Sequence, residues 1–303
     1  MRAGSIAAAL GLVLVAGTAA AQDMEPKAYS ASPAGANFLV VSYTRSTGDV
    51  VFDPTLPVSD VEASVNGYVL AVGHSFGLFG DLALVTVALP YATADVTGKV
   101  QEQAAAISRS GLADARLKFS INLMGNPAMT AREFARAPRK PIVGASLAVQ
   151  APTGQYYDTK LINIGNNRWA FKPEVGLSIP IRRVDADLYA GAWFFTANDD
   201  FYPSGLKRTQ DPVFALQAHV SWTLRPRAWI AFDSTWYSGG SAQVADGSPS
   251  TSVNNSRAGV TLSLPVGRRY SFKVAYASGV TVRTGTDFTT YAVAWQALWL
   301  SPR

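Results

Sequence analysis

The sequence predicts an all-β fold: a closed, membrane-spanning, up-and-down antiparallel β-barrel of about twelve strands. Three observations support this class. Polar and apolar residues alternate along segments of roughly ten residues. The connections between the segments are by turns long and short, as expected for long extracellular loops and short periplasmic turns. Only 16% of the 303 residues are charged, below the roughly 25% of soluble domains, while 48% are apolar.

The N-terminal part of the chain precedes the alternating segments and divides in two. Residues 1–21 have a basic start, an apolar stretch and three alanines before Gln22, which is the pattern of a secretory signal peptide. Residues 22–35 contain two prolines and have no periodic pattern. We expect this second part to be a periplasmic tail or a plug in the lumen, and residues 36–303 to form the barrel.

Charge and cysteine content exclude several classes of protein. The chain has 26 basic and 21 acidic residues, a net charge of +5, and no cysteine. Disulfide scaffolds and cysteine-based metal sites or catalysis are therefore ruled out. So small a positive excess on an exported chain does not indicate nucleic-acid binding. We expect no cofactor and no metal ion.

The predicted strands are the segments that alternate. In the clearest of them, residues 212–224, the side chains of Gln217, His219 and Ser221 share a polar face, while Val220 lies on the apolar face. A transmembrane barrel is apolar outside and polar inside, so we assign the polar face to the lumen. The even number of predicted strands fits a closed bacterial barrel. The predicted strands are residues 36–46, 61–76, 81–92, 112–123, 141–151, 168–181, 185–197, 212–224, 228–238, 255–265, 269–278 and 287–299.

The connections give a second, independent indication of a barrel. The short ones are residues 77–80, 182–184, 225–227 and 266–268. One connection breaks the rule: residues 124–140 should be periplasmic but are long, and we expect a helical turn from Met129 to Ala135. The long connections, predicted to be extracellular, are residues 47–60, 93–111, 152–167, 198–211, 239–254 and 279–286.

Bulky aromatic residues stand near strand ends on the apolar faces, where transmembrane barrels carry interfacial girdles. A secreted β-sandwich also has alternating strands, but it rarely needs twelve long strands in one module. The aromatic positions therefore favour the barrel. They are Trp169, Trp222, Trp236, Tyr270, Tyr276, Tyr291, Trp295 and Trp299.

Two lumen-facing residues on neighbouring strands are predicted to touch. If residues 225–227 form a three-residue turn, His219 lies directly opposite Asp233, and such pairs have Cβ atoms about 4.5–5.5 Å apart. With Ser221 on the same face, the set resembles the hydroxyl, imidazole and carboxylate of nucleophilic catalysis. The other interpretation is a hydrogen-bonded pair that lines or narrows the pore.

The lumen-facing side chains carry charges of both signs. One interpretation is a substrate path; the other is a salt-bridge network that fills a narrow barrel. Eight-stranded barrels are filled by side chains and those of about 16–18 strands hold a water channel, so twelve strands are compatible with both. The residues that we expect to line the path are His219, Asp233, Gln217, Ser221, Lys172, Glu174, Arg116, Lys118 and Arg257.

Several short motifs occur in combination: Pro152-Thr153-Gly154-Gln155-Tyr156, Asn163-Ile164-Gly165-Asn166-Asn167-Arg168, Lys172-Pro173-Glu174, Gln210-Asp211-Pro212, Gln217-Ala218-His219, Gly239-Gly240 and Asn255-Ser256-Arg257-Ala258-Gly259. With them the chain resembles the family of outer-membrane transporter-like β-barrel proteins of the MetA pathway of phenol degradation, best over residues 111–299. The resemblance implies an outer-membrane barrel that passes aromatic or other apolar small molecules.

We therefore expect a channel or transporter, not an enzyme, for passive uptake of small aromatic or hydrophobic compounds across the outer membrane of a Gram-negative bacterium. The expected partners are outer-membrane lipids, the small solute, and the barrel-assembly machinery with periplasmic chaperones; the oligomeric state is open. Two alternatives remain. One is a barrel enzyme that hydrolyses lipid through His219, Ser221 and Asp233, and the other is a closed structural or adhesive barrel.

Overall fold

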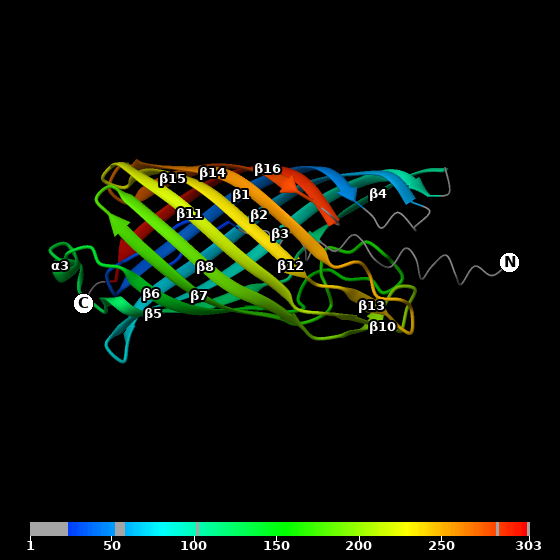
Figure 1. The fold of residues 1–303 in the computed structure, drawn as a ribbon, viewed down its shortest axis with the longest axis horizontal. Coiled ribbons are helices and arrows are strands. Elements are labelled where there is room, and N and C mark those ends of the chain that lie inside the picture. Colours follow the sequence, from blue (N-terminus) through cyan, green and yellow to red (C-terminus); the bar gives the residue numbers. More distant parts are fainter. Residues whose placement is uncertain (1–23, 52–57, 101–102, 283–284, 302–303) are drawn as a thin grey trace.

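The structure, a computed structural model, describes residues 24–51, 58–100, 103–282 and 285–301. The signal peptide predicted for residues 1–21 lies outside these ranges. Over the described residues, twelve long antiparallel strands form one closed barrel whose strands run obliquely around a long axis (Figure 1). They are β1 (Ala36–Val51), β2 (Val58–Leu78), β3 (Asp81–Val100), β5 (Arg116–Pro127), β6 (Ile142–Gln150), β7 (Ala170–Ile181), β8 (Val184–Phe195), β11 (Val213–Arg225), β12 (Ala228–Gly239), β14 (Val253–Val266), β15 (Tyr270–Thr281) and β16 (Gly285–Leu300).

The barrel closes between its first and last strands. β1 pairs with β16 from Ala36 opposite Leu300 to Val51 opposite Gly285. In lipid an unpaired sheet edge would leave N–H and C=O groups without partners at several kcal/mol each, so closure is what allows this sheet to span a membrane. The predicted class of fold is confirmed. Among the described residues there is no helix long and apolar enough to cross a membrane.

The predicted strand ends were wrong on one side of the barrel. Residues 47–60 and 93–111 were expected to be loops, but β1 continues to Val51 and β3 to Val100, where it pairs with β4 (Gln103–Leu112). These segments are rich in valine, threonine and alanine and keep the two-residue alternation, so the hairpins extend beyond the rest of the barrel. At its other end β3 pairs with β5.

The two ends of the barrel differ as predicted. At one end the connections are tight turns, together with α3 (Ala131–Phe134), the helical turn expected in residues 124–140; Thr130 and Glu133 cap it reciprocally. At the opposite end a small sheet covers the loops, with β10 (Leu206–Gln210) between β9 (Asn198–Phe201) and β13 (Ala242–Val244) (Figure 1). By the rule for bacterial barrels, the first end is periplasmic and the second extracellular.

One predicted turn has a different form. The connection between β11 and β12 was expected to have three residues, but Arg225 pairs with Ala228 and the register shifts beside Leu224. Arg227 adopts a positive φ of 66°, which closes a tighter turn, and the bulge absorbs the extra residue. From Thr223 inward the register is the predicted one.

The outer face of the barrel is apolar. Val220 is 52% exposed, and the aromatic residues predicted to form girdles lie on the same outer surface, most of them at least 42% exposed. Exposed apolar side chains over a whole sheet are unfavourable in water and suit a lipid environment. The opposite faces of the strands line the lumen.

Candidate functional site: the barrel lumen

The lumen is lined by two walls of different chemistry. The polar wall consists of the inward faces of β5, β6, β7, β8, β11, β12, β14 and β15, and it carries all nine predicted path residues. Six of them are at most 5% exposed: Glu174, Gln217, His219, Ser221, Asp233 and Arg257. The other three, Arg116, Lys118 and Lys172, are partly exposed.

His219 and Asp233 are in contact, as the register required. The Nδ1 atom of His219 lies 2.7 Å from Oδ1 of Asp233, and the second carboxylate oxygen accepts a 2.7 Å hydrogen bond from Thr261. On the other side of His219, Asp187 occupies the opposed position of β8. The imidazole is thus fixed between two carboxylate-bearing strands.

The catalytic interpretation needs a further contact that this cluster does not make. Among the described residues, neither Oγ of Ser221 nor Nε2 of His219 has a hydrogen-bond partner. A serine nucleophile depends on a hydrogen bond to its base, so only the imidazole–carboxylate half of a triad is formed. The cluster is also buried inside the barrel, away from the lipid-facing surface. The geometry therefore favours a structural pair over a lipid hydrolase.

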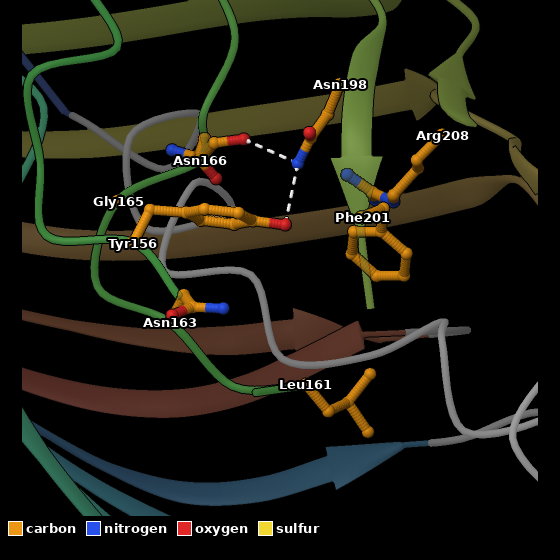
Figure 2. A pocket seen from close by; sticks show the side chains of 8 residues that line it. All are labelled: Tyr156, Leu161, Asn163, Gly165, Asn166, Asn198, Phe201 and Arg208. Atoms are coloured by element: carbon orange, nitrogen blue, oxygen red, sulfur yellow. Dashed lines mark hydrogen bonds between the residues drawn. The ribbon is translucent and has the colours of Figure 1, made fainter. Parts of the chain in front are cut away.

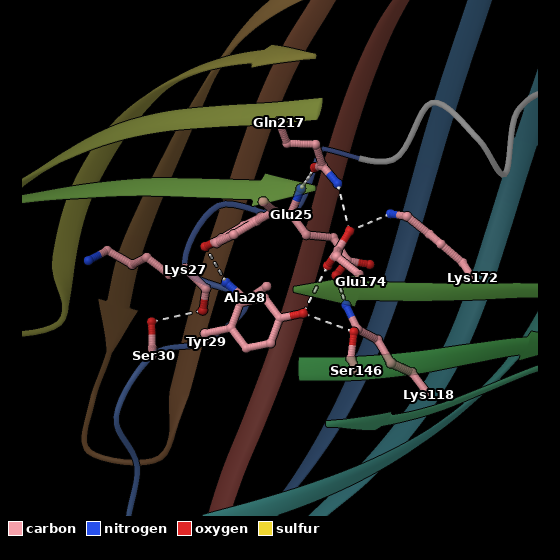
Figure 3. A network of polar contacts seen from close by, with 11 residues as sticks. Glu25, Lys27, Ala28, Tyr29, Ser30, Lys118, Ser146, Lys172, Glu174 and Gln217 are labelled. Carbon is pink, nitrogen blue, oxygen red and sulfur yellow. Dashed lines mark hydrogen bonds and ion pairs between the residues drawn. The ribbon is translucent and has the colours of Figure 1, made fainter. Parts of the chain in front are cut away.

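The N-terminal segment, residues 24–35, lies inside the lumen against the polar wall (Figure 3). Glu25 forms an ion pair with Lys118, and its backbone N–H points at the side-chain oxygen of Gln217 at 3.4 Å. Gln217 in turn donates to Glu174 at 3.3 Å, and Lys172 pairs with Glu174 at 2.6 Å. In this network, four of the predicted path residues therefore contact one another, the N-terminal segment, or both: Lys118, Lys172, Glu174 and Gln217.

Tyr29 is the most deeply buried residue of the N-terminal segment. Its hydroxyl lies 2.9 Å from Oγ of Ser146 and donates to Glu174 at 3.1 Å (Figure 3). Its ring packs edge-on against that of Tyr189, with the ring centroids 5.1 Å apart. A Cβ atom added at Gly176 would lie 2.2 Å from the Tyr29 ring, and one at Gly144 equally close. The polar wall therefore has a recess that is shaped for this ring.

Lys27 anchors the same segment to β8. Its ammonium group forms an ion pair with Asp185, which Arg139 also contacts, and its backbone N–H donates to Asp187 at 3.3 Å. The neighbouring N–H of Ala28 donates to the hydroxyl of Tyr189 at 3.1 Å. Side-chain and backbone contacts together fix the course of residues 25–29.

Electrostatics favour the ionised form of Glu25. The nearby ammonium of Lys118, followed by Lys172 and Arg116, lowers the pKa of Glu25 to about 2, against the opposing effect of burial. Glu25 thus supplies negative charge to a region where three basic residues of the wall converge.

Arg257 is separate from this network. Its guanidinium donates to the backbone oxygen of Phe288 at 2.8 Å and to Thr290 at 3.3 Å, both on β16. The predicted path residues therefore do not form a single cluster. Sequence reasoning also missed the contacts of Glu25, Lys27 and Tyr29, although two charges and a tyrosine spaced two apart in an otherwise irregular segment were a visible signal.

The second wall, the apolar wall, was not predicted. It consists of the inward faces of β16, β1, β2 and β3, where the described inward side chains carry no charge. Most of them are small or apolar and partly exposed, whereas the polar wall is largely buried. On β2 and β3 they are Val61, Ala63, Val65, Gly67, Val69, Ala71, Gly73, Thr86, Ala88, Pro90, Ala92, Ala94 and Val96.

At the extracellular end an apolar cluster covers the top of this wall. Val61, Ala63 and Val96 pack there with Phe288 and with Ile162 from the loop of residues 152–167. Leu161 packs against the same cluster and also lines a pocket between this loop and the small sheet (Figure 2). The apolar wall thus ends next to a pocket that opens among the extracellular loops.

Solved structures share this fold. The crystal structure of an outer membrane channel from Pseudomonas putida F1 aligns with 91% of this chain and 100% of its own, with a TM-score of 0.79 and 21% identity. The transport unit of the autotransporter AIDA-I from Escherichia coli aligns with 99% of this chain and 98% of its own, with a TM-score of 0.53 and 11% identity. No curated protein matches the sequence.

A family model shows the family of this chain, which structures of such low sequence identity cannot show. The model described as "Putative MetA-pathway of phenol degradation" matches residues 40–296, which include nearly all of the barrel. The match extends over both lumen walls and over the extracellular loop of residues 152–167. The chain therefore belongs to the family of the MetA pathway of phenol degradation.

Proposed function

We propose that this protein is an outer-membrane channel for passive uptake of small aromatic or other apolar compounds, which pass along the apolar wall. The observation that carries the proposal is the division of the lumen into a filled polar half and a solvent-accessible apolar half. The family description, which refers to phenol degradation, and the name of the P. putida structure, an outer membrane channel, agree with it.

The apolar wall suits an apolar solute for two reasons. The described middle sections of β2 and β3 present only short inward side chains, and the ring of Phe38 on β1 lies over Gly73, so that an aromatic surface faces the lumen there. A wall without charge also lets an aromatic ring replace water without desolvating an ion. The lining therefore favours passage of uncharged rings over ions and sugars, and no energy-coupling element is required for diffusion down a gradient.

The N-terminal segment has a complementary part in this proposal. Because residues 25–29 occupy the polar half of the lumen, they leave less room for a polar pore. The polar network then acts as a fixed support for the segment. Outer-membrane lipids and the barrel-assembly machinery are the partners that such a protein needs.

Uptake in cells tests the proposal. A Gram-negative strain that lacks its major porins and expresses the protein should take up labelled phenol faster than the empty strain, while arabinose uptake should stay at background. Equal gains for both solutes would indicate a general pore, and no gain for either would indicate a closed structural barrel. Both outcomes contradict the proposal.

Two alanine substitutions locate the path. Ala71→Asp places a carboxylate on the apolar wall and should abolish most of the gain in phenol uptake. Ala148→Asp is the matched control, because Ala148 lies inward on β6 between Lys118 and Lys172, which would compensate the new charge. Equal loss in both variants would show that passage does not follow the apolar wall.

A further inference from the structure

Two arginines at the extracellular end are buried without an acidic partner. Arg168 lies just before β7 and Arg208 lies on β10, and each is 5% exposed. Within the described part of the chain, no carboxylate forms an ion pair with either guanidinium. A buried charge is normally paired, because removing it from water costs several kcal/mol. This pair of residues is therefore an exception that needs a cause.

The protein contacts of both guanidinium groups leave donors unused. Arg168 donates to the side-chain oxygen of Gln210 and lies over the ring of Phe195 at 4.3 Å, but its Nη1 has no partner among the described residues. Arg208 lies over the ring of Phe201 at 5.6 Å, and its Nε has no partner there either. Arginine has only donors, so each unused position calls for an acceptor.

The charges of the two residues also oppose each other. Burial lowers the pKa of Arg208 to about 10. Burial, followed by the repulsion of Arg208, lowers the pKa of Arg168 well below its ordinary value, and Asp114 offsets this only in part. The Asp114 carboxylate is already occupied by Gln150, by Asn166 and by the backbone N–H of Gly154. An anion between the loops would relieve both effects.

Arg208 lines the pocket between the loop of residues 152–167 and the small sheet (Figure 2). The pocket is partly open to solvent. Asn198 donates to the hydroxyl of Tyr156 at 2.9 Å and so holds that ring in the wall, with Phe201 beside Arg208. Leu161 connects the pocket to the cluster above the apolar wall.

We propose that this pocket binds the carboxylate of a small aromatic acid, with Arg208 as the direct contact and Arg168 as a supporting charge. A guanidinium matches a carboxylate in geometry and charge, and the neighbouring rings of Tyr156 and Phe201 offer contact to an aromatic body. The site lies at the outer end of the apolar wall. The inference rests on the proposed function and adds a binding site for aromatic acids beside the path of the uncharged rings.

Titration calorimetry on the full chain in detergent tests this without any variant. Benzoate should bind about tenfold or more tightly than benzyl alcohol, which has a similar shape but no charge, because a hydrogen bond between two charged groups is about twice as strong as one between neutral groups. Equal binding of the two, or no binding of benzoate, would overturn the proposal. Inorganic phosphate that binds as tightly as benzoate would show a simple anion site and would also overturn it.

Substitutions then identify the residues. Arg208→Gln should weaken benzoate binding about tenfold or more, and Arg208→Lys by less. Lys207→Gln is the matched control, because Lys207 is the adjacent residue of β10, exposed, and 3.6 Å from Asp199. Its affinity for benzoate should be unchanged. Heat-dependent migration in detergent gels shows that each variant is folded. Folded Arg208→Gln with wild-type affinity would contradict the assignment.

The two proposals fail separately. If phenol uptake exceeds background but benzoate does not bind, the channel proposal stands and the carboxylate site is wrong. If benzoate binds through Arg208 but neither phenol nor benzoate is taken up, the protein has an aromatic-acid site without the proposed transport.

Discussion

The two walls of the lumen are built from the same antiparallel strands but differ in the polarity and burial of their inward side chains. On the polar wall, Asp233, His219 and Glu174 are buried and hydrogen-bonded to other polar groups, and Glu174 also accepts a hydrogen bond from Tyr29 of the N-terminal segment. On the apolar wall, Val69 and Ala71 are partly exposed and no charge faces inward. One half of the lumen is therefore a packed interior, and the other half is a surface. The comparison predicts that equivalent changes on the two walls have unequal effects.

The largest difference is expected for aromatic truncation. Tyr29→Ala should lower the free energy of unfolding by about 3–5 kcal/mol, because it leaves a cavity in the polar half and removes the contacts to Ser146 and Glu174. Phe38→Ala on the apolar wall, where Phe38 is partly exposed, should cost clearly less. Denaturant titration followed by tryptophan fluorescence measures both. Equal losses would mean that both halves are packed alike.

Lysine substitutions compare the cost in stability of a charge on the lipid-facing surface with that of a charge in the accessible half of the lumen. Val220→Lys places a charge on the outer face and should cost about 2–4 kcal/mol at mid-membrane depth. Ala71→Lys faces the accessible lumen and should be tolerated with a much smaller loss of stability. The folded yield and the denaturant midpoint of the two variants, measured under the same conditions, show which substitution is more destabilising. Equal loss of stability in Ala71→Lys and Val220→Lys would contradict an accessible lumen beside the apolar wall.

Removal of a buried hydrogen-bond partner should have a smaller effect. Asp233→Ala leaves His219 and Thr261 without their shared acceptor and should cost about 1–3 kcal/mol. Ser42→Ala, an inward change on β1, should stay within about 0.5 kcal/mol. Thermal unfolding in the same detergent gives both values, and a neutral Asp233→Ala would show that the polar network is not needed for stability.

The pH dependence of the N-terminal segment should be the smallest effect. The pKa of Glu25 is lowered to about 2 from an ordinary value near 4.5, so its ion pair with Lys118 stabilises the folded state fully above pH about 4.5 and loses this as the pH falls toward 2. Because Glu25 is 45% exposed, the contribution is about 0–1 kcal/mol.

Hydrogen exchange of residues 25–29 measures this contribution. Protection should be constant from pH 7 to 5, after correction for intrinsic rates, and should fall below pH 4. In Glu25→Gln the step should be absent, while Glu62→Gln, which changes an acidic residue of β2 instead, should keep it. A step that persists without Glu25 would assign the effect to another carboxylate.

The barrel was predictable because alternation and closure are strong local rules. The pattern Gln217, His219, Ser221 against Val220 fixed which face is inside, and the hairpin register then placed His219 against Asp233. The error at Leu224 did not matter, because a bulge absorbed one residue without changing the inner register. Strand ends outside the membrane were mispredicted because no change in composition marks them.

The division of the lumen into a polar and an apolar wall could not be predicted from local sequence patterns. Each strand of the apolar wall shows small inward residues, but their gathering on one side follows from the order of β16, β1, β2 and β3 around the barrel. The recess for Tyr29 depends on Gly144 and Gly176, which lie on different strands. Likewise, Arg168 and Arg208 are 40 residues apart in sequence and meet only through loop packing that has no periodic signal.

The unequal height of the barrel has a consequence for where a solute first meets the protein. β2 has 21 residues, about 70 Å of extended chain, against the roughly 9–11 residues that a tilted strand needs to cross the hydrocarbon layer. The hairpins of β2, β3 and β4 therefore extend beyond the outer surface of the bilayer on one side of the barrel. On β2 and β3 the inward residues Val61, Ala63 and Val96 continue the apolar wall upward, while β4 adds Arg109 to the same face. If the proposed function holds, we expect a solute to meet the barrel first on this taller side.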